Sequence, residues 1–409
     1  MKKVRNMKRI IQNIIAVVVA SIAFISCQQF KDAVNTSDVR ELNAVVKVTL
    51  NVGNAPIPDV LNVKLINYAE KYEITKTMDP NGTVTIDKII PGIYTITITS
   101  EKNKDGFTYN YSGNLVNKEI ISTGGELNVT VGASKSGALV MKEIFYCGSK
   151  TPTGGSYFRD QFYEIYNNSE TPQNVKGLAI AILNPNTATA NLPVWPGEDA
   201  ANYVYATTIW QVPSDKDYII QPGESIIIAQ MADNHQKSNL NPTSPVNLLS
   251  AEFETYINTT SIISDNPAIN MFMAFWPSPT PQWLTTVFGG AFVIYFPSTP
   301  INPVDYISPI GSTSKNYKIK IDDVVDAVEL VGNPNQVQLK RVPAVLDAGA
   351  TTVGATYVSK SVARKVKETK QDGRVIYYDT NNSSEDFAVM DVPMIRRNGA
   401  KAPVWNTWK

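Results

Sequence analysis

The sequence of 409 residues has few of the side chains on which most enzyme active sites depend. It contains one histidine, His235, and two cysteines, Cys27 and Cys147. A structural or catalytic zinc site usually needs three or four such ligands, so the composition argues against one. The nucleophile elbow G-x-S-x-G, the P-loop, the dinucleotide fingerprint and H-E-x-x-H are also absent. A Ser-His-Asp triad would have to use His235, which stands in the polar stretch MADNHQKSN, where we expect it to be solvated.

Runs of basic residues are missing outside the first ten positions. Residues 1–26 hold five of the 37 Lys and Arg residues and no Asp or Glu, which leaves 32 basic against 37 acidic residues in the remainder. A mildly acidic chain without a basic patch does not suit the phosphate backbone of nucleic acids. We therefore expect no nucleic-acid partner.

Long apolar runs are also scarce. The main one extends from Ile14 to Ile25; five basic residues precede it, and Ser26-Cys27 follows it. This pattern predicts a signal peptide over residues 1–26, because it has a charged start, a short apolar core and a small residue before the expected cleavage site. The Cys that follows resembles a lipobox, although Phe24 replaces the usual Leu. This predicts acylation of Cys27, which would anchor the mature chain in a membrane and leave Cys147 without an intrachain disulfide partner. The alternative is an ordinary signal peptide with an incidental Cys.

Residues 27–42 are predicted to be a lipidated tether. The residue after Cys27 is Gln28 rather than Asp, and Lys31-Asp32 resembles the charged export signals of Bacteroides-type surface lipoproteins. The resemblance implies an outer-membrane lipoprotein displayed at the cell surface.

Residues 43–132 show the period-two alternation of β-strands, as in VVKVTLNV and YTITITS, with Pro, Gly, Asn and Asp between the runs. The stretch GTVTIDKIIPGIYTITIT, with Pro91-Gly92 before Tyr94, resembles prealbumin-like modules of the carboxypeptidase-regulatory type. That resemblance implies a β-sandwich that serves as a spacer or adhesive unit. A small-residue linker is predicted at residues 133–137.

Residues 138–400 carry a second set of strand patterns in an order that resembles the lamin-tail domain, an immunoglobulin-like sandwich. Leu178 stands where that family has Trp. The resemblance implies an all-β chain of two sandwiches, the second with structural roles for Glu143, Glu164, Asn167, Gly177, Arg364 and Asp386. Arg364 is the ion-pair partner that we expect for Glu164. The positions that carry the pattern are Glu143, Phe162, Glu164, Ile165, Tyr166, Asn167, Gly177, Pro222, Gly223, Asp323, Val325, Asp326, Arg364, Asp379, Asn381, Asp386 and Phe387.

A bare sandwich of this kind needs only about 100–130 residues. The excess is predicted to lie in insertions near residues 183–215 and 232–315, and residues 401–409 are predicted to be a C-terminal tail. Flat aromatic rings at an exposed site stack on sugars or anchor partner proteins. If exposed, the insertions would offer such rings as a ligand- or partner-binding surface; the alternative is that these rings cover the enlarged core. The rings are Trp210, Phe275, Trp276, Trp283, Phe288 and Tyr295.

Calcium is the only cofactor for which the sequence offers candidate ligands. Side chains with oxygen atoms stand at every second position, as in a calcium-binding loop: Asp379, Asn381, Ser383 and Glu385. However, Ser384 and Met390 stand where a calcium loop of the EF-hand type has Gly and Glu. The alternative is a turn in which Asp and Asn side chains bond their own backbone.

The overall layout resembles a Bacteroides-type lipoprotein family of unknown function. It implies a non-enzymatic surface lipoprotein that binds a ligand, such as a glycan or small molecule, or a partner, such as an outer-membrane receptor of the TonB-dependent type. A structural or adhesive surface module is the second hypothesis. A carboxylate- or calcium-dependent hydrolase is the third, although no pair of carboxylates stands out.

Overall fold

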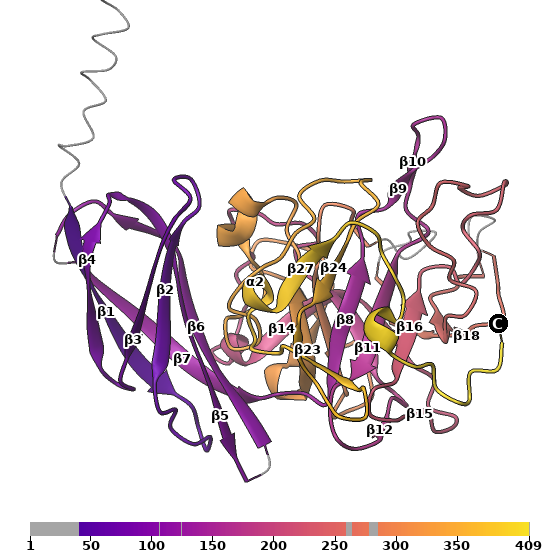
Figure 1. Ribbon diagram of the computed structural model, residues 1–409, viewed down its shortest axis with the longest axis horizontal. Helices are drawn as coiled ribbons and strands as arrows, with labels where there is room; N and C mark the ends of the chain where they lie inside the picture. Colours follow the sequence, from indigo (N-terminus) through magenta and orange to yellow (C-terminus); the bar gives the residue numbers. More distant parts are fainter. Residues whose placement is uncertain (1–40, 106, 124, 259–263, 278–284, 409) are drawn as a thin grey trace, which may run out of the picture.

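The structure, a computed structural model, describes residues 41–105, 107–123, 125–258, 264–277 and 285–408. Their regular secondary structure is almost entirely β-strand, which confirms the expected all-β class with sandwich domains. Figure 1 shows two bodies side by side, here called the N-terminal module (residues 41–135) and the C-terminal module (residues 136–408). Cys27 and the tether up to residue 40 lie outside the described residues, so their lipidation stays a prediction. No helix among the described residues is both long and apolar enough to cross a membrane.

The N-terminal module is one seven-stranded sheet in the order β3-β2-β5-β6-β7-β1-β4. Strand β1 shows why this sheet forms. Its residues Leu42, Ala44, Val46 and Val48 are buried, and the residues between them are less buried or exposed. Alternation of this kind places every second side chain in the core. The strands are β1 (Leu42–Asn51), β2 (Leu61–Asn67), β3 (Tyr72–Met78), β4 (Thr83–Ile89), β5 (Gly92–Lys104), β6 (Phe107–Ile120) and β7 (Gly125–Lys135).

The C-terminal module contains two larger sheets. The first, in the order β18-β17-β16-β11-β8-β24-β27, is called the β11 sheet. Its strands are β8 (Leu139–Phe145), β11 (Phe162–Asn167), β16 (Ser225–Ala229), β17 (Phe253–Glu254), β18 (Ile269–Asn270), β24 (Ser361–Arg364) and β27 (Phe387–Met390).

The second sheet, in the order β21-β22-β14-β13-β20-β23 with β19 also beside β14, is called the β13 sheet. Its strands are β13 (Ala179–Leu183), β14 (Tyr203–Gln211), β19 (Phe272–Phe275), β20 (Ala291–Tyr295), β21 (Tyr306–Ile307), β22 (Asn316–Lys320) and β23 (Val324–Glu329).

Short elements complete the module. Strand pairs are β9 (Ser149–Lys150) with β10 (Ser156–Tyr157), β12 (Gln173–Asn174) with β15 (Ile219–Ile220), and β25 (Val366–Thr369) with β26 (Val375–Tyr377). The helical turns are η2 (Ala200–Asn202), η3 (Ile321–Asp323), η4 (Pro334–Leu339), α2 (Ser383–Asp386) and η5 (Arg397–Gly399).

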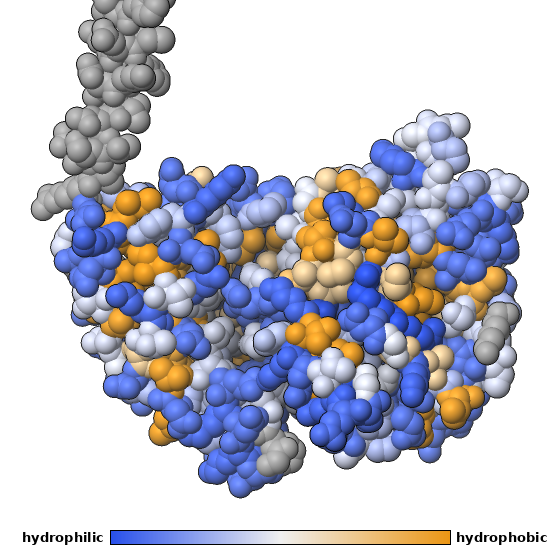
Figure 2. Space-filling model, in the orientation of Figure 1, coloured by the Kyte–Doolittle hydropathy of each residue, from blue (hydrophilic) through white to orange (hydrophobic). Residues whose placement is uncertain are grey.

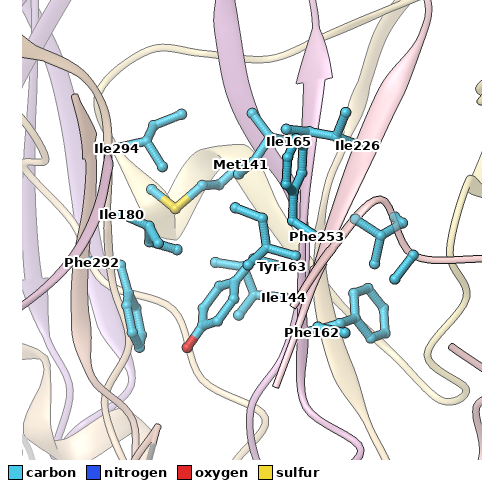
Figure 3. Packing of buried hydrophobic residues seen from close by; sticks show 14 of the residues in the cluster. Met141, Ile144, Phe162, Tyr163, Ile165, Ile180, Ile226, Phe253, Phe292 and Ile294 are labelled. Carbon is cyan, nitrogen blue, oxygen red and sulfur yellow. The ribbon is translucent and has the colours of Figure 1, made fainter. Parts of the chain in front are cut away.

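The main core lies between the β11 and β13 sheets. Figure 3 shows Tyr163 pointing toward Phe292, and their ring centroids are 5.1 Å apart. Phe162 points to the other side of the β11 sheet and packs against Phe145. Every residue of β8, β11, β13, β16 and β20 is buried. Strands covered on both faces need no polar positions, which explains why β13 and β20 are continuous apolar runs. Strands β8 and β11 also bury charged side chains, Lys142, Glu143 and Glu164.

Several predicted boundaries look different in the structure. Residues 133–135 are the end of β7, so only residues 136–138 connect the modules. The predicted insertions supply strands of both sheets, including the internal strand β14. The predicted tail packs on the C-terminal module: Trp405 donates to the Ile219 carbonyl (2.8 Å) and Trp408 to that of Ala251 (2.7 Å).

The two modules are joined by specific hydrogen bonds. Ser112 Oγ donates to the Ala344 carbonyl (2.6 Å), Asn110 Nδ2 to that of Asp379 (2.7 Å), and Asn381 Nδ2 to Ser134 Oγ (2.6 Å). Lys64 and Glu385 form an ion pair at 2.8 Å. The interface therefore fixes the two modules relative to each other.

Candidate functional site

Three of the six aromatic residues proposed as a binding surface are buried in the structure. Trp210, Phe275 and Tyr295 are 1%, 1% and 2% exposed, because β14 and β20 have cores on both faces of their sheet and Phe275 of β19 packs into one of these cores. For these three candidates the alternative holds: the rings cover the enlarged core and are not open to ligands. Trp276 is half-buried edge-on against Trp210, and Phe288 is 59% exposed. Trp283 lies outside the described residues.

Glu164 is a buried structural residue, but its predicted partner is wrong. Its carboxylate accepts from Lys142 Nζ at 2.8 Å and from the Arg396 amide at 3.0 Å. The strands slip by one residue between Glu164 and Ile165, which makes Lys142 the extra residue of a β-bulge in β8. Burial is the main cause that lowers the pKa of Lys142, although Glu164 opposes it.

Arg364 instead lies among three carboxylates. Its guanidinium is 2.8 Å from Asp326, 3.2 Å from Asp386 and 3.3 Å from Asp379. Burial raises the pKa of Asp379 to about 7, while Arg364 acts in the opposite direction. All four groups are at most 8% exposed, so this cluster holds strands together and offers no opening to a substrate.

The other residues with predicted structural roles stabilise turns. Glu143 accepts from Ser361, Met394 and Arg397. Asn167 Nδ2 donates to the carbonyls of Thr171 (2.8 Å) and Ile220 (3.0 Å). Gly177 has φ +73°, a left-handed conformation that favours glycine in the turn before β13.

The calcium candidates do not converge. Asp379 faces Arg364, Asn381 donates to the N-terminal module, Ser383 donates to Asp347 and Glu385 pairs with Lys64. Across the described ranges no group of three or more His, Cys, Asp or Glu side chains is placed to hold a metal. The loop acts as an inter-module contact.

His235 is fully buried, so the expectation that it is solvated is wrong. Its Nδ1 is 2.8 Å from the Tyr157 hydroxyl and its Nε2 is 2.9 Å from the Met231 carbonyl. Burial lowers the pKa of His235 to about 4. Asp160 is bonded to Ser149 (2.6 Å) and Ser244 (2.8 Å), not to His235, so these groups form no triad.

Asp160 provides a pH-dependence test. Burial raises its pKa to about 6 from 3.8, so the folded state is favoured by protonation and loses about 2.4 kcal/mol as the pH rises from 4 to 7. We expect D160N to lack this loss, so its unfolding free energy relative to wild type rises by about 2.4 kcal/mol over that interval. Urea denaturation at both pH values measures the difference. The exposed control D305N should show a change below about 0.5 kcal/mol. An equal change in the two variants would contradict the assignment.

The structure contains an aromatic pocket that the sequence interpretation missed. It is called here the Trp195 pocket, has a volume of about 310 Å³, and lies between the loop that precedes β14 and the chain around Arg341. The half-buried Trp195 ring stacks flat on Tyr205, with centroids 3.7 Å apart and an interplanar angle of 4°. Residues that line it are Leu183, Asn184, Leu192, Pro193, Trp195, Ala200, Ala201, Tyr203, Val204, Tyr205, Arg341 and Pro343.

The loop that carries Trp195 is fixed at several points. The Ile310 amide donates to the Val194 carbonyl (2.8 Å), and the Tyr205 hydroxyl donates to that of Ala200 (3.1 Å). Arg341 donates to the Pro185 carbonyl (3.1 Å) while its Nε binds Glu329 at 2.7 Å. The guanidinium charge in the pocket wall is thus neutralised. A second cation, Lys318 Nζ, lies 3.8 Å from the centroid of the Tyr203 ring and is paired with Asp199 at 3.6 Å.

A second cavity, the inter-module cavity, adjoins this pocket and has a volume of about 670 Å³. Ala201 and Tyr203 line both. Asn51 and Thr130 come from the N-terminal module, and Asn202 and Asp322 come from the C-terminal module.

A separate notch is visible in Figure 2 between the tip of the β5–β6 hairpin and the C-terminal module. It is lined mainly by charged and polar residues such as Glu101 and Lys367, which form an ion pair at 2.9 Å.

The signal that could have revealed the pocket is the run LPVWPG at residues 192–197. A Trp between prolines outside any alternating pattern belongs to a loop, where an aromatic ring has no core to fill. Its proximity to Tyr203 and Tyr205 depends on the sheet and could not be read from the spacing.

The comparisons agree with this fold. A family model described as "Protein of unknown function (DUF4876)" matches residues 221–394. The chain is similar to a solved DUF4876 family protein from Bacteroides thetaiotaomicron, with 40% identity and a TM-score of 0.64 over 89% of this chain and 99% of that one. No curated protein matches.

Two other solved structures are far less similar. A putative adhesin from Bacteroides ovatus has 8% identity and a TM-score of 0.20 over 71% of this chain and 86% of that one. A streptococcal ancillary pilin has 8% identity and a TM-score of 0.15 over 70% of this chain and 60% of that one. Neither supports an inference about function.

Proposed function

This chain belongs to the DUF4876 family, described as proteins of unknown function, and from that premise we propose that it is a non-enzymatic surface lipoprotein that binds an uncharged saccharide. Fold alone does not give function, so the proposal depends on the site. It combines an anchor at Cys27 with a binding pocket at Trp195.

The observation that carries the proposal is the composition of the Trp195 pocket. A sugar ring has an apolar face of C–H groups and a rim of hydroxyls, so it suits an aromatic ring beside neutral polar groups. Trp195 and Tyr203 are half-buried and supply the rings, and Asn184 supplies a side-chain amide. The volume lies at the lower end of the roughly 300–1,000 Å³ of small-molecule sites. Because Glu329 neutralises Arg341, a charged ligand would gain little here.

The non-enzymatic part of the proposal is supported by the burial and hydrogen bonding of the carboxylate side chains. Glu143, Glu164, Asp326 and Glu329 are buried and engaged in internal hydrogen bonds, and none of them lines the Trp195 pocket. Hydrolysis of a glycoside by the usual route needs two carboxyl groups that flank the bond. Capture of a glycan beside an outer-membrane receptor, rather than its cleavage, is therefore the role that we propose.

The proposal is tested by isothermal titration of the purified protein with maltose, cellobiose, xylobiose and mannobiose and with their hexasaccharides. We expect at least one series to bind and W195A to weaken that binding at least tenfold, or about 1.4 kcal/mol. The loss follows from removal of the ring on which the sugar stacks.

Phe288→Ala is the matched control, since Phe288 is an exposed aromatic residue outside the pocket. F288A should bind like wild type. The proposal fails if none of the sugars binds, or if F288A weakens binding as much as W195A.

A further inference from the structure

The Trp195 pocket is too small to be the whole of the hollow in which it lies. The inter-module cavity is about twice as large, and the two cavities share Ala201 and Tyr203 as walls. A ligand seated on Trp195 therefore has the inter-module cavity next to it, on the side of Ala201 and Tyr203.

The walls of the inter-module cavity come from both modules. Asn51 and Thr130 are exposed on β1 and β7, and Asn202 and Asp322 are exposed on η2 and η3. Hydroxyl, amide and carboxylate groups of this kind exchange hydrogen bonds with sugar hydroxyls. None of these four side chains forms an ion pair in the described structure.

The floor of the cavity is held in place. Ser112 lines it and donates to the Ala344 carbonyl at 2.6 Å, and Asn114 donates to that of Ala348 at 3.2 Å. A ligand that bridges the modules would thus meet a preformed surface and would not have to draw them together.

We infer that the ligand is an elongated, neutral oligosaccharide that begins on Trp195 and continues past Tyr203 into the inter-module cavity. The N-terminal module is then one wall of the binding site as well as a spacer. This inference rests on the proposed function and specifies the length of its ligand.

The test compares a disaccharide with the hexasaccharide of the same series by isothermal titration. Wild type should bind the hexasaccharide at least tenfold more tightly. N51A/T130A should bind the hexasaccharide about tenfold more weakly than wild type and the disaccharide within twofold, because only the longer chain reaches the N-terminal module. The control N62A/T85A, at exposed positions of β2 and β4 that do not line the cavity, should leave both affinities unchanged.

The possible failures are distinguishable. If the disaccharide binds as tightly as the hexasaccharide, or if N51A/T130A does not affect the hexasaccharide, the extended site is wrong while the Trp195 pocket stands. If W195A leaves the binding of both sugars intact, the proposed function itself is wrong. Circular dichroism confirms that each variant is folded.

Discussion

Replacement of Arg364 by Met should lower the free energy of unfolding of the C-terminal module by about 3–5 kcal/mol, as loss of one partner of a buried ion pair generally does. The guanidinium lies within 3.3 Å of Asp326, Asp379 and Asp386, and all these groups are nearly inaccessible to water. Without it, three carboxylates remain buried against one another. We expect a smaller loss at pH 6 than at pH 8, since protonation would then neutralise part of the charge.

Urea denaturation followed by tryptophan fluorescence measures this loss. Lys360→Ala is the control, because Lys360 pairs with Asp391 at 2.7 Å on the surface, where such pairs contribute about 0–1 kcal/mol. A loss below about 1 kcal/mol for R364M would show that the cluster does not hold the strands together.

Lys142→Met should produce a loss of similar size, about 3–5 kcal/mol, for a different reason. Lys142 and Glu164 are both fully buried, and removal of the ammonium leaves the Glu164 carboxylate with the Arg396 amide as its remaining hydrogen-bond donor among the described residues. The double variant K142M/E164Q removes both charges but keeps an acceptor for that amide. It should therefore recover most of the lost stability.

The double-mutant comparison decides what the buried pair contributes. If K142M/E164Q is as unstable as K142M, the cost comes from packing of the lysine stem and not from an unpaired charge. Both variants should be measured by the same urea titration at pH 7.5.

The strands of the N-terminal module could be predicted from the sequence because their alternation follows directly from one buried face. The stretch QFYEIYNNS shows where such prediction ends. Alternation places Tyr163 and Ile165 on one face of β11, and the structure shows Tyr163 and Phe162 pointing to opposite sides. The partner of Glu164 depends on a one-residue bulge in the neighbouring strand, which no pattern within β11 encodes.

The site was harder to predict for a related reason. Trp210 and Phe275 look like surface candidates in a list of aromatic residues, but each ring is buried in one of the two cores that the β13 sheet helps to form. No pattern in the sequence places Trp195 near another aromatic residue, yet the loop that carries it stacks its ring on Tyr205. Burial is a property of the assembled sheets, so aromatic content alone could not tell core from site.

A crystal structure of the protein with the tightest-binding hexasaccharide tests the central claim most directly. We predict a sugar ring on Trp195 and a chain that runs past Tyr203 to Asn51 and Thr130, with no change in how the modules sit together. A hexasaccharide bound elsewhere on the surface, or no sugar in either cavity at saturating concentration, would contradict the account.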